Sequence, residues 1–381
     1  MPLPNTSFTR APWISDPALP PVGEIPHCTA HLLQWNSGLS AGVQGIELGN
    51  GRLRCVVLPT RGLGLWKCYL DDWEIGWRSP VAGPVHPSFV PLYDPSGLGW
   101  LDGFDELLCR CGLYSNGAPE HDAQGRLLYP LHGRIANTPA NHVELFSNSD
   151  AKELILRGTV TESRFHFQNL RLTSSVILQP LTTSLRIVDE VTNQSGRPGE
   201  MQLLYHLNLG DPLAEPNGSI VAPIKTLAPR NAHAAADLEY WQTLGPRNSN
   251  KAEQVYFLEL IPDEAGRATA LLKNADSTRA VSVTFAVAQL PYLIVWKSTA
   301  AGGDGYVCGL EPALNFPNPR SFEARQGRVR QLDPGETATF ELELRFYNTA
   351  DEVRAAEQPL IELRQSQPPL VLTEPRPEWS A

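Results

Sequence analysis

The sequence lacks the features that would place it in several large classes of protein. No uninterrupted apolar run reaches the roughly 20 residues that a membrane-spanning helix needs. The first residues, MPLPNTSFTRAPW, contain two prolines and no apolar run, which predicts the absence of a secretory signal. The formal net charge is −10 and the pI is about 5.4, so no basic face for nucleic acid is expected. We therefore expect a cytoplasmic protein that binds neither membranes nor nucleic acids.

The usual motifs of cofactor, metal and nucleophile sites are also missing. The chain has no GxGxxG or GxxxxGK[ST] loop and no GxSxG elbow. Its nine histidines are scattered without zinc-binding spacing. The six cysteines form no CxxC pair, which predicts reduced, structural thiols. We expect no metal and no cofactor.

What the sequence does have is many turns between short strands. There are 34 prolines and 30 glycines, and apolar residues make up 42% of the chain, enough for a sizeable core. Runs of alternating or β-branched residues recur at short spacing, most strongly between residues 153 and 193. No helical period is long enough for a bundle. The pattern predicts an all-β protein, one large antiparallel β-sandwich with long loops and few short helices.

Several local predictions follow from turn and capping signals. The stretches ELGNGRLRCVVL and YLDDWEIGW predict hairpins around Asn-Gly and around Asp71–Asp72. Short helices are expected near CTAHLLQW and LDGFDELL, the second with Asp102 as its N-terminal cap. We divide the chain into an N-terminal extension packed on the sandwich (1–45), the sandwich domain (46–347) and a Pro-rich C-terminal tail (348–381).

Three short segments carry polar residues where core packing would not require them. They are LHGR, LLYHLNLG and GLEPALN, which contain His132, Arg134, His206, Asn208, Glu311 and Asn315. On a strand, Leu204, His206 and Asn208 share one face, which predicts that this face lines something wet or hydrogen-bonded. Each residue alone has a plainer interpretation: a buried, satisfied histidine for His206 or a structural charge for Glu311. Arg134 alone would be a surface or ion-pairing residue.

Taken together and in this order, the three segments resemble the aldose 1-epimerase (galactose mutarotase-like) superfamily. The motifs PLHGRIANTPA, YHLNLGDPL and GLEPALNFPNPR carry the resemblance, which spans roughly residues 45 to 347. It implies the galactose mutarotase-like supersandwich fold. It also implies that Glu311 takes the proton from O1 of an aldose and that His206 protonates the ring oxygen O5, while His132 holds a sugar oxygen.

This chain departs from the pattern of the superfamily in two places. The second histidine stands in HLNLG, where the usual motif reads more like HPYFNL. A substrate-binding aspartate is also usual, and Asp211 and Asp237 are both candidates for it. The HGR form is closer to the hexose-phosphate epimerases, which leaves a phosphorylated sugar open.

We therefore predict a sugar-binding isomerase that interconverts the anomers of an aldose, with a small-molecule sugar as its partner. His206 and Glu311 are the expected catalytic pair, and the expected substrate-binding residues are His132, Arg134, Arg61 and Asn208. Gly133 is expected to let the backbone approach the ligand. Two alternatives remain: another carbohydrate-active enzyme, an isomerase or lyase on an oxidised or acidic sugar, and a carbohydrate-binding protein without catalysis.

Overall fold

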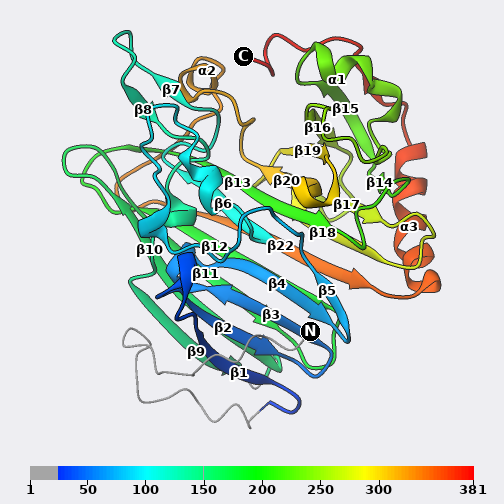
Figure 1. Ribbon diagram of the computed structural model, residues 1–381, viewed down its shortest axis with the longest axis horizontal. Coiled ribbons are helices and arrows are strands. Elements are labelled where there is room, and N and C mark those ends of the chain that lie inside the picture. The colour runs from blue at the N-terminus through cyan, green and yellow to red at the C-terminus, as the bar shows by residue number, and fades with distance from the viewer. Residues whose placement is uncertain (1–24, 149) are drawn as a thin grey trace.

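The computed structural model describes residues 25–148 and 150–381, and these residues form two large β-sheets packed face to face (Figure 1). The larger sheet has the order β1-β2-β3-β4-β6-β13-β20-β19-β16-β15-β23, with β5 beside β4 and β21 beside β13. The second sheet has the order β14-β17-β18-β22-β12-β11-β10-β9. The expected antiparallel β-sandwich is confirmed, and only the β15–β23 pair is parallel among the described strands.

The strands of the larger sheet are β1 (Thr29–Gln34), β2 (Gln44–Gly49), β3 (Leu53–Leu58), β4 (Gly64–Leu70), β5 (Trp73–Ile75), β6 (Leu108–Leu113), β13 (Gly199–Gly210), β15 (Ile224–Pro229), β16 (Gln254–Leu260), β19 (Tyr292–Thr299), β20 (Tyr306–Ala313), β21 (Arg330–Leu332) and β23 (Leu370–Val371). Those of the second sheet are β9 (His142–Asn148), β10 (Glu153–Ser163), β11 (Asn169–Leu178), β12 (Ser184–Asn193), β14 (Ser219–Val221), β17 (Arg267–Lys273), β18 (Ala280–Ala286) and β22 (Thr337–Tyr347). A separate hairpin joins β7 (Glu120–His121) and β8 (Leu127–Tyr129).

Helices are few and short apart from the last one. The α-helices are α1 (Ala232–Ala236), α2 (Arg320–Arg325) and α3 (Ala350–Gln365). The 3-10 helices are η2 (Gly38–Ser40), η3 (Pro59–Arg61), η4 (Pro87–Phe89), η5 (Gly99–Gly103), η6 (Ile135–Asn137), η7 (Leu238–Tyr240) and η8 (Gly302–Asp304). No helix in the described ranges is long and apolar enough to cross a membrane.

The local predictions have mixed outcomes. Both hairpins are confirmed, as β2–β3 and as β4–β5. The helix expected near CTAHLLQW is wrong, because this segment forms β1 and pairs with β2 along its whole length. The helix expected over LDGFDELL is also wrong in extent: η5 ends at Gly103, and Leu107 donates its N–H to Trp66 as the chain enters β6. Asp102 lies inside η5 and does not cap it.

The segments outside the predicted sandwich domain join the sheets at both ends. Of the predicted extension, residues 1–24 lie outside the described residues, and β1 forms the edge of the larger sheet. The predicted C-terminal tail contains α3, which begins after Thr349, whose hydroxyl caps the N–H of Glu352. Beyond α3, β23 pairs with β15. All six cysteines are free and buried, as expected of structural thiols.

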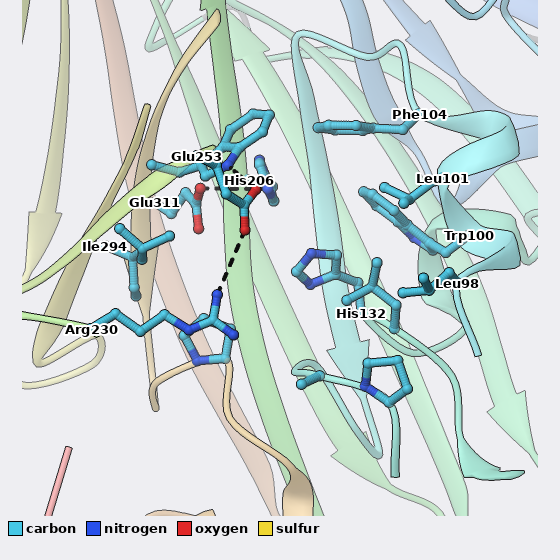
Figure 2. Close-up of a pocket in the computed structure, with 16 residues that line it drawn as sticks. Leu98, Trp100, Leu101, Phe104, His132, His206, Arg230, Glu253, Ile294 and Glu311 are labelled. Atoms are coloured by element: carbon cyan, nitrogen blue, oxygen red, sulfur yellow. Dashed lines mark hydrogen bonds and ion pairs between the residues drawn. The ribbon is translucent and has the colours of Figure 1, made fainter. Parts of the chain in front are cut away.

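Strand β13 presents two unlike faces, since successive side chains of a strand alternate. Its residues Tyr205, Leu207 and Leu209 point between the two sheets, into the largest apolar cluster. Leu204, His206 and Asn208 point the other way. His206 lines a cavity on the outer face of the larger sheet, shown in Figure 2. The predicted sharing of one face by Leu204, His206 and Asn208 is thus confirmed.

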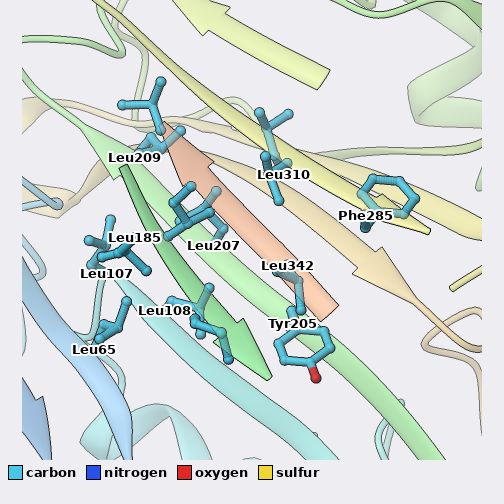
Figure 3. Close-up of a cluster of buried hydrophobic side chains, with 14 of the residues drawn as sticks. Leu65, Leu107, Leu108, Leu185, Tyr205, Leu207, Leu209, Phe285, Leu310 and Leu342 are labelled. Atoms are coloured by element: carbon cyan, nitrogen blue, oxygen red, sulfur yellow. The ribbon is translucent and has the colours of Figure 1, made fainter. Parts of the chain in front are cut away.

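A buried ion pair crosses the core between the sheets, beside the apolar cluster of Figure 3. Arg110 on β6 meets Asp189 on β12 through both carboxylate oxygens, with Nη2 to Oδ1 at 2.9 Å. The Tyr205 hydroxyl donates to the same carboxylate at 2.8 Å, and Arg110 also donates to Ser174 at 2.7 Å. Arg110 and Asp189 are buried to 1% and 0% exposure, so each charge depends on the other for its solvation.

Asp189→Asn is expected to destabilise the fold by about 3–5 kcal/mol, because it leaves the buried Arg110 without a counter-charge. The free energy of unfolding measured by urea denaturation tests this. Glu190→Gln is the matched control, since Glu190 is the next residue of β12, on its opposite face, and is only half-buried. Equal unfolding free energies for the two variants would contradict the importance of the ion pair.

Candidate functional site

A cavity of about 290 Å³ lies on the outer face of the larger sheet. Strands β13, β16, β19 and β20 form its floor, and the chain around η5 and before β9 covers it. It is lined by Leu98, Trp100, Leu101, Phe104, Ala118, Pro119, Leu131, His132, His206, Arg230, Glu253, Val255, Ile294, Trp296, Glu311 and Pro317. Three of the predicted site residues, His132, His206 and Glu311, thus line one cavity.

His206 and Glu311 lie opposite each other on the neighbouring strands β13 and β20. On either side of them along the strands, Leu204 pairs with Ala313 and Leu207 with Leu310, and this register places His206 opposite Glu311. His206 Nε2 is 3.4 Å from Glu311 Oε1, and both side chains are almost completely buried. Within the described residues this oxygen has no hydrogen-bond partner.

Gly309 makes room for the Glu311 carboxylate on the floor of the cavity. A Cβ atom at this position would lie 2.4 Å from Glu311 Oε1. Any other residue would therefore displace the carboxylate, so the sequence CGLEP leaves the space that Glu311 occupies.

Asn208 orients His206 and fixes its tautomer. The Asn208 amide nitrogen donates to the carbonyl oxygens of Glu106, at 3.0 Å, and His206, at 3.2 Å. Its Oδ1 must therefore face His206 Nδ1, 2.6 Å away, and accept the proton of that nitrogen. In neutral His206 the lone pair is then on Nε2, toward Glu311. Asn208 was predicted to bind substrate; it is fully buried and does not line the cavity, so its contact with the site is through His206.

His132 is held in the same way from the covering loop. It has a left-handed backbone, with φ of 57°, and its Nδ1 donates to the carbonyl oxygen of Asn116 at 3.0 Å. Asn116 in turn exchanges two side-chain hydrogen bonds of 2.9 Å with Asn315. The His132 ring packs 5.4 Å from that of His206 and 4.7 Å from that of Trp100, measured between ring centroids. Both histidines therefore offer an unprotonated Nε2.

Burial sets the protonation states of the three titratable groups. It lowers the pKa of His132 to about 4, with the charge of Arg230 adding to the effect, and it lowers the pKa of His206 well below its usual 6.5, with the nearby His132 adding to the effect. It raises the pKa of Glu311 well above its usual 4.5, and the charge of Glu253 raises it further while Arg230 opposes. At neutral pH both imidazoles are neutral, and burial favours the protonated form of the Glu311 carboxyl.

The structure does not place Arg61 against the cavity, which corrects its predicted role in substrate binding. Its guanidinium is 1% exposed. It donates to Glu106 at 2.5 Å, and at 2.8 Å to each of Val85 O, Gly103 O and Asn137 Oδ1. An arginine at the end of a strand can thus be wholly internal. Here Arg61 fixes the segment that contains Glu106, whose carbonyl oxygen accepts a hydrogen bond from Asn208.

Arg134 and Gly133 lie behind the covering loop and do not line the cavity, contrary to the sequence-based prediction. Both line a separate hollow of about 210 Å³ that also contains the buried carboxylate of Glu162. A Cβ on Gly133, whose φ is 72°, would lie 1.9 Å from the carbonyl oxygen of Ser115. Gly133 therefore allows the loop to pack against the end of β6, and it does not line the cavity of His206 and Glu311.

Neither candidate for a substrate-binding aspartate reaches the cavity. Asp211 pairs with Arg247 at 2.6 Å, and Asp237 pairs with Lys251 and accepts from Gln254 at 2.6 Å. Both are therefore engaged elsewhere on the surface. No group of three or more histidine, cysteine or carboxylate side chains in the described part of the chain could hold a metal ion.

Two charged residues at the cavity were missed from sequence. Arg230 and Glu253 lie 3.8 Å apart, and the indole N–H of Trp296 donates to Glu253 at 2.7 Å. The signal that could have found them is the pairing of β15 with β16: Arg230 directly follows one strand, and Glu253 directly precedes the other. Antiparallel pairing brings these two strand ends together.

The comparisons with known proteins agree with this fold. The family described as "Domain of unknown function (DUF4432)" matches residues 40–346. The crystal structure of a protein from Klebsiella pneumoniae, named a "putative aldose 1-epimerase", is 32% identical, covers 91% of this chain and 90% of its own, and has a TM-score of 0.87. No curated protein matches the chain in sequence.

More distant solved structures share the fold. A galactose mutarotase-like protein from Clostridium acetobutylicum is 14% identical, with a TM-score of 0.57 over 85% of this chain and 99% of that one. A galactose mutarotase related enzyme from Lactobacillus acidophilus is 12% identical, with a TM-score of 0.53 over 81% and 98%. The fold is thus that of the galactose mutarotase-like proteins, as the resemblance implied. Within that class, the chain belongs to the DUF4432 family.

His132 is expected to make stability depend on pH below neutrality. Its pKa is about 4 in the folded protein and 6.5 in the unfolded chain, so the unfolded state binds more protons between these values. The folded state is therefore most stable, as far as His132 is concerned, above pH 6.5, and it loses stability as the pH falls toward 4. The expected loss in unfolding free energy is about 1–3 kcal/mol, reduced from the value for full burial because one edge of the ring is in contact with the cavity.

Urea denaturation of His132→Asn at pH 7.5 and pH 4.5 measures this loss. The variant should lose less unfolding free energy on acidification than the unmodified protein, whereas His31→Asn, at an exposed position, should match the unmodified protein. An unchanged pH dependence in His132→Asn would show that His132 is protonated as easily folded as unfolded.

Proposed function

We propose that the protein interconverts the anomers of an aldose by opening and closing the sugar ring. The observation that carries this proposal is the contact of His206 Nε2 with Glu311 Oε1 at 3.4 Å on the floor of a cavity. Ring opening needs a base at O1 and an acid at O5, and an imidazole beside a carboxyl supplies both. A sugar-sized cavity over this pair brings the substrate to them.

The proton count of the pair suits this reaction. When the ring opens, the O1 proton passes to Glu311, the Nε2 proton of His206 passes to O5, the C1–O5 bond breaks and C1=O1 forms. The pair begins with one proton, on His206, and ends with one proton, on Glu311. In this scheme the proton rests on Glu311, whose protonated form burial favours, and the 3.4 Å contact provides the route by which it reaches His206 when a sugar binds. Rotation about C1–C2 and the reverse transfers complete the exchange.

The remaining side chains have positioning roles in this scheme. Asn208 keeps Nδ1 of His206 protonated, so that only Nε2 takes part in transfer. His132 presents Nε2 to a sugar hydroxyl, and Arg230 with Glu253 supplies a donor and an acceptor at the rim. Trp100, Phe104 and Trp296 offer ring surfaces to the C–H groups of a sugar.

The environment of Glu311 favours catalysis over simple sugar binding. Oε1 of Glu311 is buried without a hydrogen-bond partner among the described residues, and an unsatisfied buried polar atom destabilises a fold by about 1–3 kcal/mol. A binding protein gains nothing from such a group, because an amide or hydroxyl would hold a sugar oxygen at lower cost. An acid–base catalyst needs the raised pKa that burial produces.

Glu311→Gln and His206→Ala are each expected to lower the rate of anomer exchange by about 10²–10⁴-fold, since each removes one positioned proton transfer. NMR exchange spectroscopy over a panel of free, phosphorylated and oxidised sugars measures the rate. Glu264→Gln, at an exposed position away from the cavity, is the control and should retain full rate. Full activity of Glu311→Gln, or no accelerated exchange for any sugar in the panel, would refute the proposal.

The exchange rate is also expected to follow a bell-shaped pH profile, because the pair must hold one proton. The rate falls in acid as His206 takes up a second proton, and it falls in alkali as the pair loses its only one. Since burial lowers the pKa of His206, the acid limb should lie below pH 6.5; since burial raises the pKa of Glu311, the alkaline limb should lie well above pH 4.5. Polarimetry after subtraction of the buffer rate checks this. A single rise near pH 4.5 would instead indicate an ordinary carboxylate acting alone.

A further inference from the structure

The cavity has two unlike walls (Figure 2). Arg230, Glu253 and Glu311 lie on the side of the sheet, and Leu98, Trp100 and Leu101 lie on the side of the covering loops. We call the aliphatic part of the covering side the loop wall; it consists of Leu98, Leu101, Ala118, Pro119, Leu131 and Pro317. No side chain of the loop wall has a polar atom.

The backbone of the loop wall offers no free N–H group either. Its four amides are already donated: Leu98 N to Ser96 Oγ at 3.1 Å, Leu101 N to Leu98 O at 3.0 Å, Ala118 N to Pro317 O at 3.1 Å and Leu131 N to Gly97 O at 2.9 Å. Its other two residues are prolines, which have no N–H. The indole nitrogen of Trp100, beside the loop wall, is buried and has no hydrogen-bond partner among the described residues.

A sugar hydroxyl facing the loop wall would therefore lose water without finding a free N–H group on that wall. Three of the carbonyl oxygens there, those of Leu98, Leu101 and Pro317, already accept hydrogen bonds. A C–H group in the same place would make favourable contact with the leucine and proline side chains. The loop wall thus discriminates against a hydroxyl on the part of the sugar that it covers.

The charges of the cavity point to a neutral ligand. Arg230 is the only cationic side chain among the lining residues when the histidines are neutral, and Glu253 lies 3.8 Å from it. The pair can donate to one hydroxyl and accept from another, but it leaves no excess positive charge for a phosphate or carboxylate. The volume of about 290 Å³ is at the lower end of the range for ligand pockets, which suits a monosaccharide.

We propose that the substrate is a neutral deoxy aldose, bound with its deoxygenated carbon against the loop wall. Its O1 and O5 then face Glu311 and His206, and its remaining hydroxyls face His132 and the Arg230–Glu253 pair. This proposal rests on the proposed function, because it takes the ligand to be an aldose ring with a free anomeric hydroxyl. It goes further by naming the class of aldose.

Matched pairs of sugars test the preference. The exchange rate constant per enzyme is measured by NMR for D-glucose, D-galactose, D-mannose and D-ribose, each against its deoxy forms at every ring or terminal carbon other than C1. An apolar wall discriminates against an added hydroxyl by up to about 10²-fold, so at least one deoxy sugar should exceed its parent by about tenfold or more. Parents that equal or exceed all their deoxy forms would overturn the proposal.

Leu101→Gln locates the source of the preference. Leu101 is 44% exposed, so an amide side chain is tolerated there, and it gives the loop wall a donor. The variant should lose most of the preference for the deoxy sugar. Leu128→Gln is the matched control, since Leu128 is also 44% exposed but lines the hollow of Arg134. An unchanged preference in Leu101→Gln, or an equal loss in Leu128→Gln, would overturn the assignment to the loop wall.

Binding measured on the Glu311→Gln protein separates this proposal from the proposed function. Tryptophan fluorescence reports sugar binding directly, since Trp100 and Trp296 line the cavity. Tighter binding of the deoxy sugar without any accelerated exchange in the unmodified protein would support the ligand class and refute mutarotation. Accelerated exchange with tighter binding of the fully hydroxylated parent would support mutarotation and overturn the ligand class.

Discussion

The buried ion pair between Arg110 and Asp189 is the interaction on which the orientation of the site depends. It joins β6 of the larger sheet to β12 of the second sheet, and the Tyr205 hydroxyl binds the same carboxylate. Because side chains alternate along β13, fixing Tyr205 inward directs His206 outward. A shift in the register of β13 by one residue would bury His206 in the core and, at the same time, remove Tyr205 from the network around the ion pair. The polar network in the core therefore specifies the register from which the cavity is built.

A second series of hydrogen bonds connects the buried Arg61 to His206. Arg61 holds the Glu106 carboxylate and the Gly103 carbonyl, and the Glu106 carbonyl accepts from the Asn208 amide. Asn208 then determines which nitrogen of His206 is protonated. The buried polar groups of Arg61, Glu106 and Asn208 thus act in sequence to place the lone pair of His206 on Nε2. This is the usual way in which a buried network restricts a reactive side chain to a single state.

The sequence predicted the parts of this arrangement that have local signals. Alternation along LLYHLNLG placed His206 and Asn208 on one outward face, and the order of three short motifs indicated the superfamily. The sequence could not distinguish the internal Arg61 from an arginine that binds ligand, because the burial of Arg61 depends on the distant residues Glu106 and Asn137. The strand β6 could not be predicted from its own stretch of sequence, which is rich in proline and glycine, because its strand conformation comes from pairing with β13.

Arg230 and Glu253 show the same limit from another side. They are 23 positions apart, and neither lies in a motif; only the pairing of β15 with β16 brings them to one rim. Arg134 shows the converse, since it stands two residues after His132 yet lies in a different hollow. The left-handed backbone at His132 and Gly133 turns the chain there, so adjacent residues of one motif serve separate surfaces.

The same covering loop shapes the chemistry of the cavity as well as its outline. It excludes water from Glu311 and His206, and this exclusion, more than any single charge, raises one pKa and lowers the other. The apolar covering side that, in our proposal, restricts which sugar hydroxyls can be accommodated is also part of the burial that shifts these two pKa values. In the proposed function, substrate choice and acid–base chemistry would both follow from one physical property of the site, the exclusion of water.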